Sequence, residues 1–149
     1  MAKKLYLPIR KDPDIRQFSN QDNAGQMGER YAARYLEENG YKMIAIRERD
    51  HRGEIDIIAK HLSEKTIVFV EVKTLRTSKP GHPAERVDRR KQRQITHAAL
   101  RYLKRNHQLE FKARFDIIAI RWPHHEDVPS EIQHFISAFE SVDDYQIFG

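Results

Sequence analysis

The segment from Thr66 to Thr74 constrains the fold of this 149-residue chain more than any other part of the sequence. It is almost entirely apolar and predicts a strand, in which alternate side chains lie on opposite faces. Glu71 and Lys73 therefore share one face of an otherwise apolar strand. Burying such a face costs free energy unless the charges are paired with each other or bind a metal ion.

Hydrophobic periodicity predicts how the other elements surround this strand. Apolar residues at three- and four-residue spacing predict a helix that begins after Asp22-Asn23 and stops at Gly40. A second helix is predicted from about Val87 to Asn106. Further strands are predicted over residues 42–47, 54–60 and 113–121, and the segment 131–139 fits a strand or a helix, of which we favour a strand. This order indicates an α/β fold with a mixed β-sheet flanked by helices.

The ends of the chain differ from this central pattern. Residues 1–22 combine charges and two prolines with little periodicity, so we predict an irregular N-terminal arm followed by one domain over residues 23–149. The chain has no cysteine, which excludes disulfide scaffolds, thiolate zinc sites and cysteine nucleophiles. No apolar run exceeds four residues and the start lacks the pattern of a signal peptide, so we expect a cytoplasmic protein without a membrane partner.

Charge is strongly segregated along the sequence. Residues 73–105 contain 11 Lys and Arg against two acidic residues, whereas residues 123–149 contain six acidic residues and no Lys or Arg. A basic segment of this density is typical of proteins that bind a polyanion. The residues expected to contact DNA phosphates are Arg76, Lys79, Arg86, Arg89, Arg90, Lys91 and Arg93. The alternative is a solvated helix face, balanced by the acidic tail of the same chain or of a second copy in a homodimer.

The register of the predicted hairpin places a second acidic residue next to the charged strand. If the turn between residues 60 and 66 is centred near Ser63, Asp56 lies opposite Glu71, where directly opposed Cβ atoms are about 5 Å apart. Two carboxylates beside Lys73 are suited to Mg²⁺ or Mn²⁺ near a phosphate group. The alternative interpretation is an ordinary salt bridge of Glu71 with Lys73 at the edge of the sheet.

Several motifs, in this order, resemble the YraN family of predicted endonucleases, which is similar to the PD-(D/E)xK nucleases and to archaeal Holliday-junction resolvases. The motifs are Gly28-Glu29, Gly53-Glu54-Ile55-Asp56, Phe69-Val70-Glu71-Val72-Lys73, the helical pattern from Lys91 to Leu103, and Arg114-Phe115-Asp116. The resemblance implies an α/β restriction-endonuclease-like fold, a mixed β-sheet flanked by helices, in which Asp56, Glu71 and Lys73 take the catalytic positions. It also implies that Glu29, which residue chemistry alone treats as a solvated carboxylate, is a third acidic residue near the metal.

The sequence thus predicts a metal-dependent DNA endonuclease, and the resemblance favours branched or structured DNA as its substrate. The alternatives are a non-catalytic nucleic-acid-binding module with the same fold and a protein-interaction domain whose basic helix meets an acidic partner. Zinc binding by His124, His125 and His134 is less favoured, because they lack compact spacing, and we interpret them as surface residues. His51 and His82 lie in loops that flank the expected site.

Overall fold

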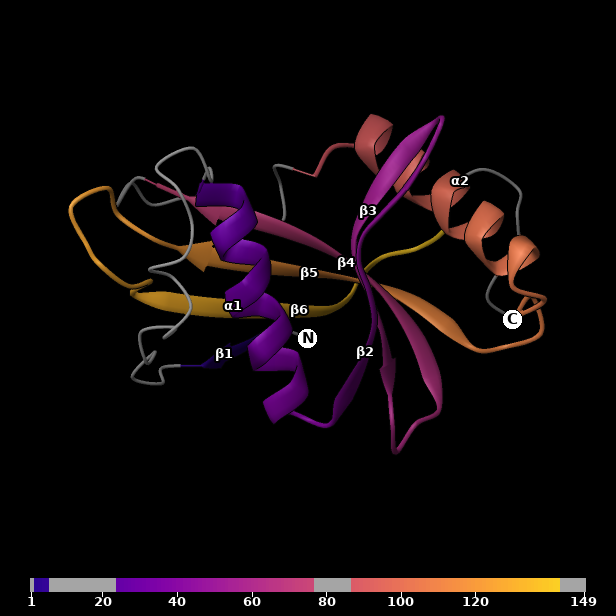
Figure 1. Ribbon diagram of the computed structural model, residues 1–149, viewed down its shortest axis with the longest axis horizontal. Helices are drawn as coiled ribbons and strands as arrows, with labels where there is room; N and C mark the ends of the chain where they lie inside the picture. The colour runs from indigo at the N-terminus through magenta and orange to yellow at the C-terminus, as the bar shows by residue number, and fades with distance from the viewer. Residues whose placement is uncertain (1, 6–23, 77–86, 143–149) are drawn as a thin grey trace.

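The computed structural model describes residues 2–5, 24–76 and 87–142 (Figure 1). Its elements in chain order are β1 (Ala2–Leu5), α1 (Ala24–Glu38), β2 (Tyr41–Asp50), β3 (Gly53–His61), β4 (Thr66–Leu75), α2 (Arg89–Arg105), β5 (Ala113–Arg121) and β6 (Glu131–Phe139). Both predicted helices and the favoured strand at residues 131–139 are confirmed. Gly40 ends α1 with a φ of 88°, a conformation that glycine adopts without strain.

The strands form one sheet in the order β1-β6-β5-β4-β3-β2. The β4–β5 pair is parallel and the other pairs are antiparallel, so the predicted mixed α/β sheet is confirmed. A parallel pair needs a crossover connection, and α2 supplies it between β4 and β5. Neither of the two described helices is long and apolar enough to cross a bilayer.

The two helices cover opposite faces of the sheet. Val68 and Val70 on β4 belong to the core that packs under α1, whereas Ile67 and Phe69 belong to the core under α2. This alternation confirms the predicted strand pattern. If the alternation continues along β4, Glu71 lies on the face that α2 covers. The helix α2 is the crossover between the parallel strands β4 and β5.

The start of the chain departs from the prediction of an irregular arm. Ala2–Leu5 forms β1 and pairs antiparallel with β6, from Ala2 opposite Phe135 to Leu5 opposite Ile132. The prediction was therefore wrong for these four residues, because backbone hydrogen bonds to a free strand edge need no side-chain periodicity. The rest of the arm, and the Asp22-Asn23 cap, lie outside the described residues.

The close approach of α1 to the sheet depends on Gly28. This residue is buried in α1, and a Cβ atom added there would clash with Oγ1 of Thr74 on β4. Thr74 Oγ1 is itself buried without a hydrogen-bond partner. Gly28 therefore allows α1 to pack directly on the end of β4 that carries the charged residues.

We predict that Gly28→Ala lowers the free energy of unfolding by about 1–3 kcal/mol, because overpacking outweighs the better helix propensity of alanine. Gly25→Ala, at an exposed position of the same helix, is the control and should be neutral or stabilising by up to about 1 kcal/mol. Adding Thr74→Ala to Gly28→Ala should recover most of the loss in urea unfolding. A double variant as unstable as Gly28→Ala alone would contradict the packing explanation.

Candidate active site

The site begins where the pairing of β3 with β4 ends. The pairs run from His61 opposite Thr66 to Ile57 opposite Val70, the register from which Asp56 was placed opposite Glu71. Beyond the last pair, Oδ2 of Asp56 accepts a hydrogen bond from the backbone N–H of Val72 at 2.8 Å. The carboxylate of Asp56 thus takes the place of a strand partner between β3 and β4.

The alternation of β3 also breaks at Asp56. Ile55 and Ile57 are two residues apart and would share a face in a regular strand, yet Ile55 packs in the core under α2 and Ile57 in the core under α1. On the neighbouring strand β2, Arg47 has a φ of 56°, a left-handed conformation that is uncommon for a non-glycine residue. The β2–β3 hairpin therefore bends away from β4 at this point (Figure 1).

Glu71 is the most deeply buried charged residue of this region, with 5% of its side chain exposed. Its carboxyl group lies close enough to that of Asp56 for the charge of Asp56 to act on it. Its Oε1 lies 3.4 Å from Nζ of Lys73 and 3.7 Å from Nζ of Lys91 on α2. The structure therefore brings together the predicted trio of Asp56, Glu71 and Lys73, and it adds a second lysine.

Burial disfavours the ionised form of both carboxyl groups and so raises their pKa values. It raises the pKa of Glu71 to about 7, and the neighbouring charge of Asp56 adds to the rise while Lys91 and Lys73 oppose it. Burial also raises the pKa of Asp56, although the N–H of Val72 opposes that rise. Two adjacent carboxyl groups with raised pKa values favour any ligand that brings positive charge between them.

Two further carboxylates lie near the pair of Asp56 and Glu71, which we call the dyad. Glu29 approaches from α1, and Glu54 precedes Asp56 by two residues on β3. One oxygen from each of Glu29, Glu54 and Asp56 lies within 4.8 Å of the other two. The placement of Glu29 agrees with the prediction made from the resemblance. Sequence reasoning missed Glu54, although its two-residue spacing from Asp56 was a usable signal.

Arginine side chains hold these two outer carboxylates. Nε of Arg47 lies 2.6 Å from Oε2 of Glu29, and the guanidinium of Arg49 bonds Oε2 of Glu54 through Nε at 2.8 Å and through an Nη atom at 2.5 Å. Burial still raises the pKa of Glu29, despite the hydrogen bond from Arg47. Both arginines come from β2, so the bent hairpin carries Glu54 and Asp56 together with the counterions of Glu54 and of Glu29.

The donor set suits a hard divalent cation. Its ligand atoms are carboxylate oxygens, and Mg²⁺ binds oxygen at about 2.0–2.1 Å with near-octahedral geometry and usually keeps several waters. Small side-chain rotations could bring Glu29, Glu54 and Asp56 from their present spacing onto one ion. An acidic cluster that could bind a metal is therefore present; it contains the predicted ligands Asp56 and Glu29, with Glu54 in the place of the predicted ligand Glu71.

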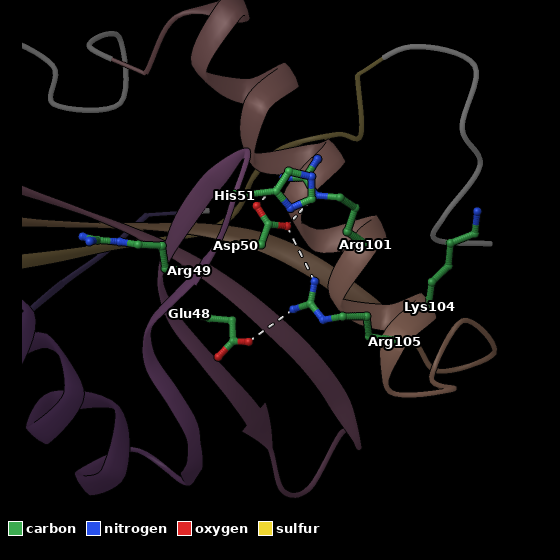
Figure 2. A pocket seen from close by; sticks show the side chains of 7 residues that line it. All are labelled: Glu48, Arg49, Asp50, His51, Arg101, Lys104 and Arg105. Carbon is green, nitrogen blue, oxygen red and sulfur yellow. Dashed lines mark hydrogen bonds and ion pairs between the residues drawn. The ribbon is translucent and has the colours of Figure 1, made fainter.

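A charged contact joins the hairpin tip to α2 (Figure 2). Nε of Arg101 lies 2.5 Å from Oδ2 of Asp50, and Arg105 lies 3.2 Å from Glu48. The hydrogen bond from Arg101 holds the pKa of Asp50 well below its usual range. A pocket of about 560 Å³ adjoins this contact and is lined in part by Arg49 and His51. The tip of the hairpin is thus fixed to α2 on the far side of the carboxylates.

The residues predicted to contact DNA differ in their surroundings: some are exposed, some contact other side chains, and some lie outside the described residues. Arg89, Arg90 and Arg93 are exposed in the first turns of α2. Lys91 contacts Glu71 instead of pointing only to solvent, and the guanidinium of Arg76 lies 5.3 Å from the centre of the Trp122 ring. The predicted contacts Lys79 and Arg86, with the loop residue His82, lie outside the described residues.

The Arg114-Phe115-Asp116 motif belongs to a different part of the molecule. Asp116 is fully buried, accepts from Nε of Arg114 at 3.0 Å, and lies 2.7 Å from Nε2 of His134. Tyr35 contacts the other ring nitrogen of His134 at 3.1 Å. The interpretation of His134 as a surface residue was wrong: it is 1% exposed, and its hydrogen bonds make its burial tolerable.

Comparisons with known proteins agree with the motifs. Residues 28–120 match the uncharacterised protein family UPF0102. A UPF0102 protein of Rhodopirellula baltica is 49% identical over 138 residues, covering 91% of this chain and 83% of that protein. A UPF0102 protein of Geobacter sulfurreducens is 47% identical over 116 residues, covering 78% of this chain and 88% of that protein.

A search of solved structures gives a weaker likeness. The structure of Pyrococcus furiosus SfsA in complex with Ca²⁺ matches with a TM-score of 0.38 and 12% sequence identity. The match covers 74% of this chain and 63% of that structure. It is too weak to assign a shared fold or ligand.

The raised pKa of Glu71 predicts how its replacement changes stability with pH. The folded protein holds a proton on Glu71 up to about pH 7, whereas the unfolded chain releases it near its ordinary pKa of 4.5. Protonation thus stabilises the fold fully below that ordinary value, and this stabilisation is lost as the pH rises towards 7. Glu71→Gln should therefore unfold like the parent near about pH 5 and be more stable by roughly 2 kcal/mol near about pH 8.

Urea unfolding of both proteins at the two pH values checks this prediction. Glu64→Gln, a change of the same kind at an exposed glutamate away from the site, is the control variant. An equal difference between parent and Glu71→Gln at both pH values would contradict the assignment.

Proposed function

We propose that this chain, which belongs to the UPF0102 family, is a metal-dependent DNA endonuclease acting on branched or structured DNA. The observation that carries the proposal is the convergence of Asp56 and Glu71 beside Lys73 where the β3–β4 ladder ends. A protein that only bound DNA would have no use for buried carboxylates near a phosphate, because they repel it.

The chemistry follows from the groups at the site. A bound Mg²⁺ or Mn²⁺ would lower the pKa of a water molecule and neutralise charge on the phosphate. Asp56 and Glu29, with Glu54, would hold the ion, and Glu71 would reach it from beside Asp56. Lys73 would orient the attacking water or stabilise the negative charge of the transition state. Water adds to phosphorus and the bond to one ester oxygen breaks, leaving a phosphate monoester and a hydroxyl group.

The exposed arginines of α2 supply the binding surface of this proposal. Arg89, Arg90 and Arg93 precede or follow Lys91, whose ammonium group lies at the carboxylates. Contacts of arginine with backbone phosphates give affinity and orientation without reading the base sequence. A non-catalytic binding module is the alternative outcome of the tests below.

We expect Lys73→Met to reduce single-turnover cleavage at least about 100-fold while changing DNA affinity in Ca²⁺ by less than about threefold. One phosphate contact among many contributes little to binding, but the charge of Lys73 acts where negative charge develops. The assay uses linear, flapped and four-way DNA with Mg²⁺ or Mn²⁺. Lys65→Met, in the exposed β3–β4 turn, is the matched control and should cleave normally.

If the parent protein cleaves none of these substrates, the endonuclease proposal is wrong and the binding module replaces it. If Lys73→Met cleaves as fast as the parent, another centre must carry the activity.

Replacement of Arg89, Arg90 and Arg93 together by alanine should weaken binding to all DNA sequences to a similar extent. The slope of log affinity against log salt should fall by about 2–3, since up to three phosphate contacts are lost. Fluorescence anisotropy over a salt series measures both quantities in Ca²⁺. An unchanged slope would mean that these arginines only solubilise the helix.

A further inference from the structure

Lys91 differs from its basic neighbours on α2 because it points at the buried dyad. Oδ1 of Asp88, the N-cap of α2, accepts a hydrogen bond from the backbone N–H of Lys91 at 2.9 Å and fixes the first turn. The ammonium group of Lys91 then lies 3.7 Å from Oε1 of Glu71. The side chain of Lys91 is still 39% exposed, so its charged end lies between the carboxylates and the solvent.

Two lysines share one carboxylate oxygen. Lys73 lies nearer to Oε1 of Glu71 than Lys91 does, at 3.4 Å against 3.7 Å, and its side chain is less exposed. A divalent cation bound to Glu71 would repel both ammonium groups over a few ångströms in a partly dry site. Lys91 is the lysine that can leave, because it has the longer contact, the more exposed side chain and a flexible four-carbon stem.

We propose that Lys91 is a second catalytic lysine, which exchanges between Glu71 and a substrate phosphate. This proposal rests on the proposed function and adds a residue to it. Without metal, the ammonium group of Lys91 compensates the charge of Glu71. When the divalent cation binds, that group is released towards solvent, where it contacts the phosphate that approaches the cation. Lys91 is therefore a competitor of the metal as well as a ligand of the substrate.

The exchange predicts two effects of Lys91→Met with opposite signs. Binding of Mn²⁺ to the DNA-free protein at about pH 8 should tighten by roughly threefold to tenfold, because a competing charge is removed. Single-turnover cleavage at saturating Mn²⁺ should instead slow by at least about tenfold, because the phosphate loses its partner. A residue that served only to pack α2 would not tighten metal binding.

Calorimetric titration with Mn²⁺ and a cleavage assay measure these two effects. Lys104→Met is the control, since it removes the same charge about 20 Å further along α2, and its side chain extends away from Asp50 (Figure 2). This control should leave the Mn²⁺ affinity unchanged. Lys91→Arg keeps the charge, so it should bind Mn²⁺ within about twofold of the parent and retain more cleavage than Lys91→Met.

If Lys91→Met binds Mn²⁺ no more tightly than the parent, the proposed exchange of Lys91 between Glu71 and the phosphate is wrong. The same holds if Lys91→Met cleaves DNA at the rate of the parent. If the parent binds Mn²⁺ but cleaves nothing, the proposed function fails, while tighter binding by Lys91→Met still supports competition at Glu71. If the parent binds no Mn²⁺, both proposals fail.

Discussion

The end of the β3–β4 ladder is the constraint on which the site depends. A backbone N–H that loses its strand partner inside a protein must find another acceptor. The carboxylate of Asp56 satisfies the N–H of Val72 at this point, and that hydrogen bond fixes the carboxylate next to Glu71. The left-handed conformation of Arg47 on the adjacent strand accompanies the same bend. A regular hairpin would have placed Ile55 and Ile57 on one face of the sheet.

Electrostatics then determine which ligands this acidic cluster can accept. Glu29 and Glu54 each have an arginine partner, and Glu71 has two lysines. The acids are thus largely compensated before any cation arrives, and a divalent ion alone adds a positive excess. A phosphate group that enters with the ion would remove that excess. Under the proposed function, the same charges would favour joint binding of metal and DNA over binding of either one, a coupling that is reciprocal by thermodynamic linkage.

The sequence predicted the centre of the site better than its surroundings. Side-chain alternation and a short turn were enough to bring Asp56 next to Glu71, although the ladder ends one pair earlier, at Ile57 opposite Val70. Residue chemistry did not select Glu29, which reaches the site only through the packing of α1, and the resemblance supplied it. Lys91 was assigned to DNA, since no local pattern tells which side chain of a basic helix turns inward. Burial of His134 depends on pairing with Asp116, a contact that no sequence spacing encodes.

Two contacts tie α2 to the sheet around the acids, one to Glu71 on β4 and one to the tip of the β2–β3 hairpin. At its first turn, the cap by Asp88 directs Lys91 to Glu71, and further along the helix Arg101 bonds Asp50 at the hairpin tip. The two contacts are about 15 Å apart along the helix axis, so they restrict both the position and the tilt of α2. A phosphate bound by the exposed arginines of α2 would then have a defined position relative to Asp56. Affinity without base recognition is therefore compatible with accurate placement of one phosphate, because the orientation comes from the helix and its anchors.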